Sequence, residues 1–394
     1  MSEWRDVTLG DVLTLQRGFD ITKKMQRPGA VPVISSSGIG SYHDEARADG
    51  PGVVIGRKGS LGTVFFVEEP YWPHDTTLWV KDFKDNDPYF CHLLFKTLPL
   101  AELDAGSSNP TLNRNHAHKL PVRIPGLPLQ RRISAVLAAF DELIAINECR
   151  IELVEGLTRS FYREWFVRFR FPGPGGLPPK GGCGCNAPPG WREMPLGELA
   201  EVVSDGILPA DVPPAARYCG LEHLPRRATT LREWSTADTV TSRKLRFQEG
   251  DTLFGKIRPY FHKVVWAPFA GIASSDAIVF RALQDRPLPA LINAILSSDP
   301  VVAKAVATSN GTKMPRVDPR ALLDYPVVLP AREEGLVSQA ETALRATYDH
   351  CAALARQNLI LAETRDLLLP RLVTARLDIS DVDLGDLLAD EDAE

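Results

Sequence analysis

The sequence predicts an α+β protein made of two copies of one half-unit, each a strand-rich domain followed by a long helix. Three observations support this fold class: the opening motif returns in mid-chain, short apolar runs are bounded by Gly and Pro, and two long segments have helical periodicity. The opening, WRDVTLGDVLTL at 4–15, returns as WREMPLGELAEVV at 191–203. Four of its residues, Trp4, Arg5, Leu9 and Gly10, recur with one common shift of 187 positions.

The repeat continues beyond the opening motif. Apolar or alternating runs such as VVIG, TVFFVEE, DTLFG and HKVVWAP predict its strands. The matched stretches are 52–66 with 250–265, 74–80 with 275–281, 107–114 with 308–316 (which aligns Asn109 with Asn310), and 120–125 with 325–330.

Each copy ends in a helical segment of more than 35 residues, at about 129–169 and 332–377. Apolar residues recur there at 4-3-4 spacing, with one Asn in each row, which is typical of helices that pack side by side. One alternative is that each helix covers its own sheet. At about 1.5 Å per residue the helices are too long for that, so we favour an antiparallel coiled-coil pair between the domains. The residues expected to pair are Leu137, Phe140, Ile144, Asn147, Ile151, Leu354, Asn358 and Leu361.

The expected boundaries follow from this pattern. They are a first strand-rich domain at 1–127, a central helix at 128–170, a Gly/Pro linker at 171–190, a second domain at 191–330, a distal helix at 331–377 and an acidic tail at 378–394. The Gly and Pro density of 171–190 excludes a persistent helix or strand there.

Bulk composition fits a cytoplasmic globular protein, with 44% hydrophobic and 24% charged residues. The sequence has no apolar run long enough to span a membrane and no secretory signal pattern. The net charge of −5 argues against a nucleic-acid partner, but eight acids lie in 378–394, and the rest of the chain is mildly basic. The stretch 217–263 contains ten Lys and Arg residues and five acidic residues, so it is locally basic.

Active-site patterns are incomplete, so we expect no catalytic residue, no cofactor and no metal site. GDTLFGKI at 250–257 has the spacing of a phosphate-binding loop, but Ile257 stands where a hydroxyl is required. His74 and Asp75 could form part of a catalytic triad, but no motif in the sequence supplies the nucleophile. The Cys183–Gly–Cys185 pair lies in the linker and fits no zinc pattern.

The remaining polar loops have the composition of a DNA reader. Lys and Arg neutralise phosphates, while Arg on guanine and Asn on adenine make bidentate base contacts. The alternative is that these are ordinary solvated loops, although both copies carry the same kind of patch at the same place. The candidate DNA contacts are Arg57, Lys58, Ser60, Asn109, Thr111, Asn113, Arg114, Arg243, Lys244, Arg246, Lys256, Arg258, Tyr260, His262, Lys263, Asn310, Thr312, Lys313 and Arg316.

The chain resembles the specificity subunits of type I restriction–modification systems over nearly its whole length. The resemblance rests on the order of the parts, on WRDVTLGDV and WREMPLGEL, and on the helix endings LTRSFYREWF and ETRDLLLPRLVTARLDI. It implies two target-recognition domains, each reading one half of a bipartite double-stranded DNA site, and paired helices as a spacer. It also implies that two methyltransferase subunits and the restriction–translocase subunits carry the catalysis.

Three other readings remain open. The chain could be a self-contained methyltransferase or nuclease, which would need the missing catalytic motifs. It could be a coiled-coil scaffold that binds proteins without sequence-specific DNA binding. It could also be the specificity subunit of a methylation-only complex.

Overall fold

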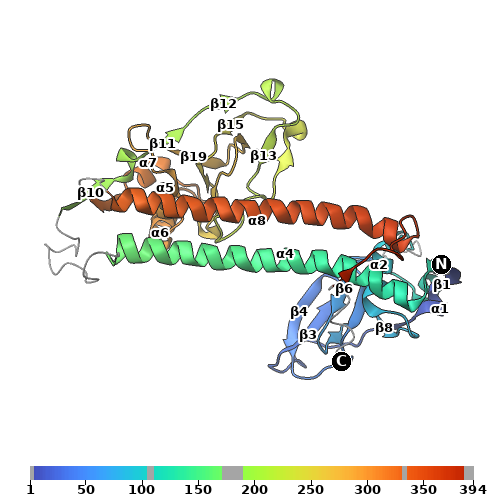
Figure 1. Ribbon diagram of the computed structural model, residues 1–394. Coiled ribbons are helices and arrows are strands. Elements are labelled where there is room, and N and C mark those ends of the chain that lie inside the picture. Colours follow the sequence, from blue (N-terminus) through green and yellow to red (C-terminus); the bar gives the residue numbers. More distant parts are fainter. Residues whose placement is uncertain (1–3, 104–110, 171–189, 331–334, 386–394) are drawn as a thin grey trace. The chain divides into compact units, whose positions relative to one another are not determined.

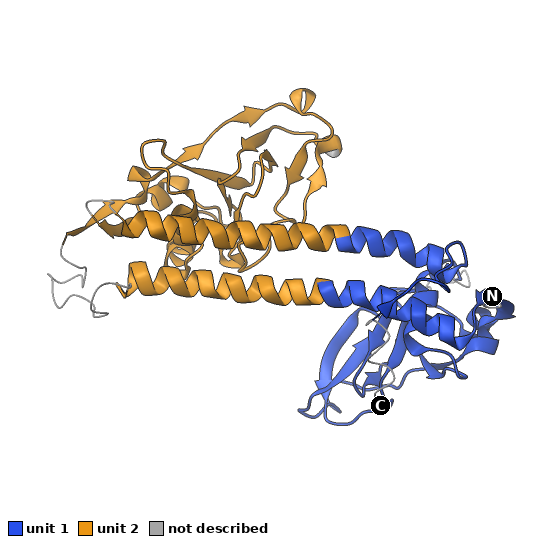
Figure 2. Ribbon diagram, viewed as in Figure 1, with its two compact units in different colours: residues 1–143, 361–394 blue, residues 144–360 orange. Residues whose placement is uncertain are grey.

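The computed structural model describes residues 4–103, 111–170, 190–330 and 335–385 (Figure 1). The chain divides into two compact units (Figure 2). Unit 1 comprises residues 1–143 and 361–394, and unit 2 comprises residues 144–360. Helices α4 (Leu127–Tyr162) and α8 (Leu336–Val373) are each divided between the two units.

Unit 1 is built on a four-stranded antiparallel sheet in the order β2-β8-β5-β6. Its strands are β2 (Thr14–Arg17), β5 (Gly52–Gly56), β6 (Val64–Val67) and β8 (Thr77–Asp82). A second sheet has the order β4-β3-β7, with β3 and β7 parallel, and β1 pairs with β9. These strands are β1 (Arg5–Thr8), β3 (Val31–Ser35), β4 (Gly38–His43), β7 (Trp72–Pro73) and β9 (Pro121–Ile124). The short helices are α1 (Leu9–Val12), α2 (Pro88–Lys96), η1 (Leu100–Glu102) and α3 (Arg114–His118).

Strand β5 is buried along its whole length because both faces of its sheet are covered. Successive side chains of a strand point to opposite faces. Val53 and Ile55 accordingly join the core that includes α2, while Val54 joins a second cluster with Ile34 and Tyr71. Because both faces of β5 are buried, its sequence is the continuous apolar run GVVIG and does not alternate between polar and apolar residues.

Unit 2 contains a four-stranded sheet in the order β11-β19-β16-β17 and a five-stranded sheet in the order β12-β15-β18-β13-β14. Strand β10 pairs with β20. The strands are β10 (Trp191–Pro195), β11 (Ala200–Val203), β12 (Gly206–Ile207), β13 (Arg217–Cys219), β14 (Ser235–Thr236), β15 (Lys244–Phe247), β16 (Thr252–Gly255), β17 (Val264–Trp266), β18 (Gly271–Ala273), β19 (Ala277–Ala282) and β20 (Pro326–Pro330). The helices are η3 (Leu196–Glu198), η4 (Pro209–Asp211), η5 (Ala237–Thr239), η6 (Pro259–Phe261), α5 (Pro289–Leu296), α6 (Asp299–Ala307) and α7 (Pro319–Leu323).

The two units share one topology, and this confirms the predicted α+β class with an internal repeat. The four-stranded sheets have the same order and pairing, with β2, β8, β5 and β6 matching β11, β19, β16 and β17. The parallel pair β3–β7 matches β13–β18. Unit 2 adds β12 and β15 on the far side of β18.

Two of the predicted alignments have the wrong register. Gly56 pairs with Thr77, and Gly255 pairs with Ala277, so His74 corresponds to Ser274 and the match of 74–80 is with 274–280. Thr111 bridges Lys58 where Arg316 bridges Ile257, so Thr111 corresponds to Arg316 and not to Thr312. In both places, identical residue types in the two copies do not occupy equivalent backbone positions.

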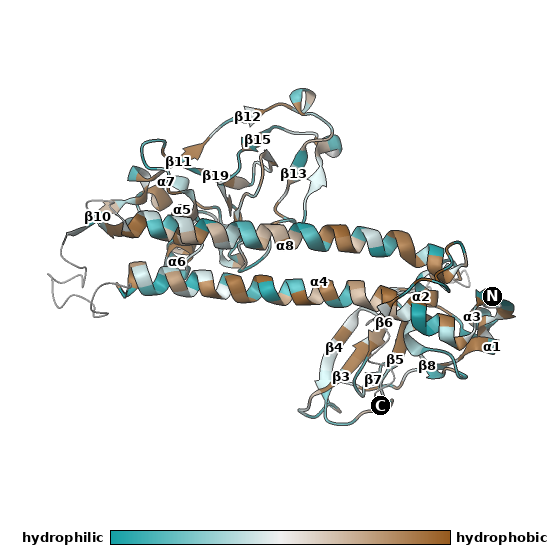
Figure 3. Ribbon diagram, viewed as in Figure 1, coloured by the Kyte–Doolittle hydropathy of each residue, from teal (hydrophilic) through white to brown (hydrophobic). Residues whose placement is uncertain are grey.

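The long helices run antiparallel within each unit. In unit 2 the buried Asn147 amide donates to Oδ1 of Asn358 at 2.9 Å, and the hydroxyls of Thr158 and Thr347 lie 3.0 Å apart. Ile151 and Leu354 pack in one small apolar cluster. In unit 1 Leu137 joins the core together with Leu369 and Leu372. The hydropathy pattern along both helices alternates between polar and apolar faces (Figure 3).

The helix ends differ from the expected bounds. Helix α4 ends at Tyr162 and continues as a π-helical turn, η2 (Arg163–Val167), whereas a helix to residue 170 was expected. In the described residues no single helix has the length and apolarity to cross a membrane, although α5 and α6, bent by 60°, meet that test as a pair.

Candidate nucleic-acid interface

In unit 1 the candidate contacts gather where β5 ends. The amides of Arg57 and Lys58 both donate to the carbonyl of Thr76, at 2.9 and 3.1 Å. The amide of Leu112 then donates to the carbonyl of Arg57 at 3.0 Å, which brings the 111–114 segment beside the same loop. Backbone hydrogen bonds thus hold together two loops that are far apart in sequence. These bonds do not depend on the identity of the side chains.

The side chains of these loops are accessible to different degrees. Arg57, Lys58 and Thr111 are half-buried, while Ser60, Asn113 and Arg114 are exposed. Asn113 caps α3, because its side chain accepts from the amide of Asn115 at 2.9 Å. Asn109, another candidate, lies outside the described residues.

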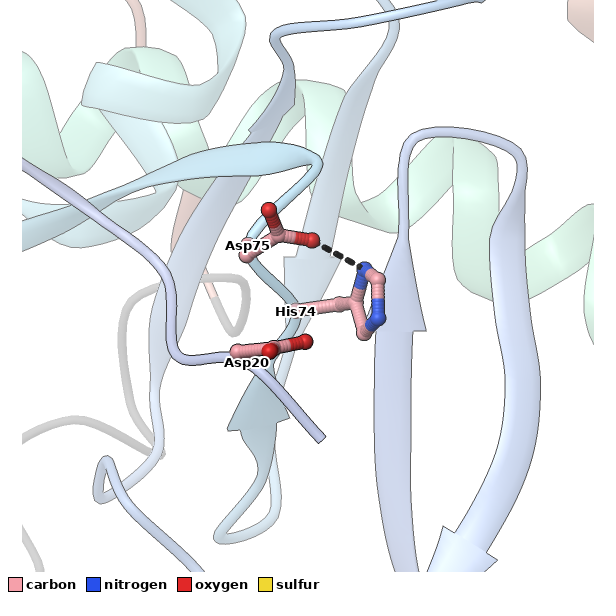
Figure 4. Close-up of side chains that lie close together, drawn as sticks. All are labelled: Asp20, His74 and Asp75. Carbon is pink, nitrogen blue, oxygen red and sulfur yellow. Dashed lines mark ion pairs between the residues drawn. The ribbon is translucent and has the colours of Figure 1, made fainter. Parts of the chain in front are cut away.

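A charged cluster at this end of the sheet escaped the sequence analysis. Arg17 donates to Asp75 at 2.8 Å, Nδ1 of His74 lies 3.2 Å from Asp75, and Asp20 lies beside them (Figure 4). Partial burial would raise the pKa of Asp75, but the hydrogen bond from Arg17 and the nearby charges outweigh it and hold that pKa below its ordinary value. Arg17 is three residues from Asp20 but 58 from Asp75, so local sequence gave no signal for the pair.

Asp20, His74 and Asp75 also have the residue types of a metal site, with ligand atoms all within 4.8 Å of one another. The Asp75 carboxylate and Nδ1 of His74 already have protein partners, however. Arg17 binds the Asp75 carboxylate, and Nδ1 of His74 lies 2.9 Å from the Thr76 hydroxyl. This arrangement is an ion-pair network beside the candidate DNA contacts.

In unit 2 the same backbone frame holds different side chains. The amide of Lys256 donates to the carbonyl of Asp276 at 2.8 Å, and the amide of Val317 donates to the carbonyl of Lys256 at 2.9 Å. These bonds match those that Arg57 and Leu112 make in unit 1. The frame is therefore repeated even though the side chains on it differ.

Two residues of this loop have left-handed backbone conformations. Arg258 and His262, both at φ 53°, flank η6, which presents the 52%-exposed Tyr260. Each such non-Gly residue costs about 1 kcal/mol. The fold holds them there: the Arg258 amide donates to the carbonyl of Pro315 at 2.8 Å, and Nε2 of His262 lies 2.7 Å from the carbonyl of Ser297.

A tight hairpin, residues 310–316, lies against this loop. Asn310 and Arg316 exchange both backbone hydrogen bonds, at 2.9 and 2.8 Å, and Gly311 supplies a positive φ of 99°. The exposed candidates on the hairpin are Asn310, Thr312, Lys313 and Arg316. A narrow loop with exposed cations and amides has the shape and chemistry to enter a DNA groove.

Burial changes the candidate set in unit 2. Lys244 is 8% exposed and donates to the Ser242 hydroxyl at 2.6 Å, and His262 is 9% exposed. Burial lowers the pKa of His262, so this side chain is neutral near pH 7. Both residues serve the structure, and we remove them from the proposed DNA contacts.

Other candidates in unit 2 are partly engaged by protein groups. Lys263 donates to the carbonyl of Leu221, and Arg246 pairs with Asp205 at 3.0 Å. Arg243 is exposed, while Lys256 and Arg258 are half-buried. Arg226, which the sequence analysis missed, stacks over Phe261 at 3.9 Å in the same loop cluster.

The helix-pairing candidates have separate positions in the two units. Leu137 is buried and Phe140 half-buried in unit 1, where Leu361 is also half-buried. In unit 2 the amide of Asn358 donates to Glu148 at 3.0 Å and to the carbonyl of Ile144 at 3.3 Å, in addition to its bond with Asn147. Ile151 and Leu354 are buried beside this polar group.

Comparison with known proteins yields one family. The model of the type I restriction modification DNA specificity domain matches residues 1–156. The MjaIX specificity subunit of Methanocaldococcus jannaschii is 20% identical over 313 residues, which cover 74% of this chain and 70% of that protein. The EcoDI specificity subunit of Escherichia coli is 21% identical over 355 residues, covering 84% and 79%.

One solved structure supports the fold independently of sequence. The type I restriction–modification S subunit from M. genitalium superposes with a TM-score of 0.65 at 12% identity, covering 96% of this chain and 97% of that one. Residues 1–156 therefore match the specificity-domain model, and the chain as a whole shares the fold of this solved S subunit.

Proposed function

We propose, from the membership of this chain in the specificity subunits of type I restriction–modification systems, that it is the DNA-reading subunit of such a complex. Each recognition domain reads one half of a bipartite asymmetric site in double-stranded DNA. The chain itself is not an enzyme: two methyltransferase subunits methylate the site, and restriction–translocase subunits cleave DNA in the full complex. We expect the complex to act in the cytoplasm.

The repeated loop frame is the observation that carries this proposal. In both units a loop after the central strand is tied by equivalent backbone bonds to a segment further along the chain, from Arg57 to Leu112 in unit 1 and from Lys256 to Val317 in unit 2. Unit 1 presents Arg57, Ser60 and Arg114 on that frame, while unit 2 presents Tyr260, Lys313 and Arg316. The same backbone arrangement with different side chains suits two domains that bind two different half-sites, because side chains that contact base edges determine the sequence recognised.

The long helices supply the second element of the proposal, a spacer and a docking surface. Helix α4 keeps Leu143, Ile146, Leu153 and Leu157 between 38% and 67% exposed, at successive spacings of three, seven and four residues. An apolar row of this kind on a helix is typical of a protein-binding face. We assign it to the methyltransferase subunits, in keeping with the family.

The decisive experiment compares DNA methylation in the native strain with and without the gene. Loss of one bipartite adenine-methylated motif on deletion is expected, and that motif gives both half-sites at once. Replacing residues 1–127 with those of another family member should then change one half of the motif and leave the other. A swap that changes both halves or neither would contradict independent readers.

Two alternatives give different outcomes. A protein-binding scaffold would bind duplex DNA without the steep loss of affinity at high salt that phosphate contacts require. A methylation-only complex would show the bipartite motif but no restriction of unmodified DNA.

A further inference from the structure

Unit 2 contains a cavity of about 560 Å³ that the DNA-reading role does not use. Its wall is formed by the last turns of α4, the π-helical turn η2, strand β17, the start of α6 and Tyr348 of α8. Ligand pockets of small molecules have volumes of about 300–1,000 Å³. The cavity is therefore large enough for a molecule of nucleotide size.

The lining is cationic. Arg159, Arg163, Arg168 and Arg227 face two carboxylates, Glu155 and Asp299, which leaves two positive charges in excess. Arg168 pairs with Glu164 at 2.6 Å, and Arg227 pairs with Asp299 at 3.6 Å.

The other two arginines are less committed. Arg159 lies 3.8 Å from Oε2 of Glu155, which is long for an ion pair, while Oε1 of the same carboxylate accepts from the amides and hydroxyls of Thr229 and Thr230. Arg163 has no ion pair with any other described residue. Guanidinium groups bind phosphate in a bidentate manner, so Arg159 and Arg163 are available to an anion.

A buried hydroxyl without a partner points to a ligand in the same cavity. Tyr348 is 4% exposed, and its hydroxyl makes no hydrogen bond within the described parts of the chain. Buried hydroxyls are normally hydrogen-bonded. Burial raises the pKa of Tyr348, so the group stays protonated and can donate to an acceptor in the cavity.

The backbone at the cavity mouth is also unusual. Helix α4 passes into the π-helical turn Arg163–Val167, where the amide of Arg168 donates to the carbonyl of Arg163 at 2.8 Å. Single π-helical turns are rare and occur often at functional sites. Here the turn places Arg163, Val167 and Arg168 in the cavity lining.

We propose that this cavity binds a nucleoside phosphate, with the phosphate at Arg159 and Arg163 and the base against the apolar wall that includes Tyr162 and Val264. Tyr348 donates its free hydroxyl to the ligand. An apolar wall beside a cationic rim favours this class over inorganic phosphate, because the base removes apolar surface from water. The proposal goes beyond DNA reading and does not depend on it.

The test uses the full chain without DNA, so that its result is independent of the proposed function. Isothermal titration calorimetry would measure binding of adenosine 5′-monophosphate, inorganic phosphate and adenosine. We expect the nucleotide to bind at least about tenfold more tightly than either fragment, since it engages both the arginines and the apolar wall. Equal affinity for inorganic phosphate, or no heat of binding at about 10 mM nucleotide, would overturn the proposal.

Variants locate the binding site. Arg163→Gln should weaken nucleotide binding about tenfold or more, because a charge-assisted hydrogen bond is lost. Tyr348→Phe should weaken it severalfold without lowering the thermal midpoint of the free protein, since the hydroxyl has no hydrogen-bond partner to lose among the described residues. Arg150→Gln, on an exposed position of α4, is the matched control and should bind normally. Unchanged affinity in both Arg163→Gln and Tyr348→Phe would place the nucleotide elsewhere.

Discussion

The two units cap equivalent helices by different means. In unit 1 the N-cap Asp87 accepts from the amide of Phe90 at 2.6 Å, and Ser134 of α4 donates to the same carboxylate. In unit 2 the N-cap position holds Leu288, and Glu341 of α8 accepts from the amides of Ala290 and Leu291 at 2.9 and 2.8 Å. The carboxylate has moved from the capped helix to the long helix that packs on it.

This difference teaches that the repeat conserves a physical requirement and not a residue. The free amides at a helix start need an acceptor, and a packed neighbour can supply it as well as the chain itself. Inside the helices the buried polar residue also differs between the units. His92 of α2 is replaced in unit 2 by the fully buried Asn293, whose amide donates to the Thr252 hydroxyl at 3.2 Å.

The largest expected effect comes from removing an anchor described above for unit 2. Glu155 of α4 binds the amides of both Thr229 and Thr230 at 2.8 Å. Glu155→Ala would leave these buried groups without an acceptor and should lower the free energy of unfolding by about 3 kcal/mol. Urea denaturation measures the change, with Glu152→Ala on the exposed face of α4 as the control. A loss below about 1 kcal/mol would show that water replaces the carboxylate.

The second prediction concerns acid. Burial lowers the pKa of His92 in unit 1 from 6.5 to about 3. Between pH 6.5 and about pH 3 the unfolded chain therefore binds a proton at His92 that the folded protein does not bind. The free energy of unfolding falls as the pH drops through this range. The loss from His92 should reach about 2 kcal/mol at about pH 5.

His92→Asn, which copies the residue of unit 2, tests this difference. We expect the variant to lose less stability between neutral pH and about pH 5, in thermal melts or in hydrogen exchange of α2. The exposed His116→Asn serves as the control. An unchanged pH profile in His92→Asn would mean that His92 does not govern the acid response.

The third prediction uses the seam of the long helices. By the repeat, the Asn147–Asn358 contact corresponds to the apolar contact of Leu354 with Ile151. Asn147→Leu alone removes the donor to Oδ1 of Asn358, whose own amide keeps Glu148 and the carbonyl of Ile144. The variant should cost about 1–2 kcal/mol. Adding Asn358→Ile should restore most of that loss, because both positions then resemble the apolar counterpart. A double-mutant cycle measures the coupling, and additive losses would contradict a direct pairing.

The smallest expected effect compares the two reading loops. Arg114→Ala in unit 1 and Lys313→Ala in unit 2 should each reduce the salt slope of DNA binding by about 1, if each neutralises one phosphate. Lys81, exposed at the other end of β8, gives the matched control. A change in one unit alone would show that the two loops do not contact DNA alike.

The sequence predicted the repeat, the long helices and the fold class, because these depend on local periodicity and on shared motifs such as Trp4 and Trp191. Register within the repeat was harder to predict. Aligning Asp75 with Asp276 by identity placed the match one residue away from the backbone equivalence, in which Thr77 corresponds to Ala277. Asp276 occupies the backbone position of Thr76, since the amides of Lys256 and Arg57 donate to the carbonyls of these two residues.

The sites were predictable only where the chemistry is local. The sequence identified the polar loops but not the burial of Lys244 and His262, which depends on packing by distant elements. It also missed Arg17, whose partner Asp75 is brought near by the pairing of β2 with β8. Burial and long-range pairing are set by tertiary structure, so no residue pattern reports them.

Unit 1 is discontinuous along the chain, and this determines the order in which a ribosome can complete the two units. Residues 1–143 emerge first, but Leu369, Leu372, Val373 and Ile379 of the same core emerge only after all of unit 2. Domains usually fold during synthesis in the order of the chain. Here synthesis of unit 1 begins first but is completed last. Part of its apolar core therefore stays exposed until the C-terminal residues have been synthesised. We expect arrested nascent chains whose residues have emerged from the ribosome only to about residue 360 to show protease protection of unit 2 but not yet of unit 1.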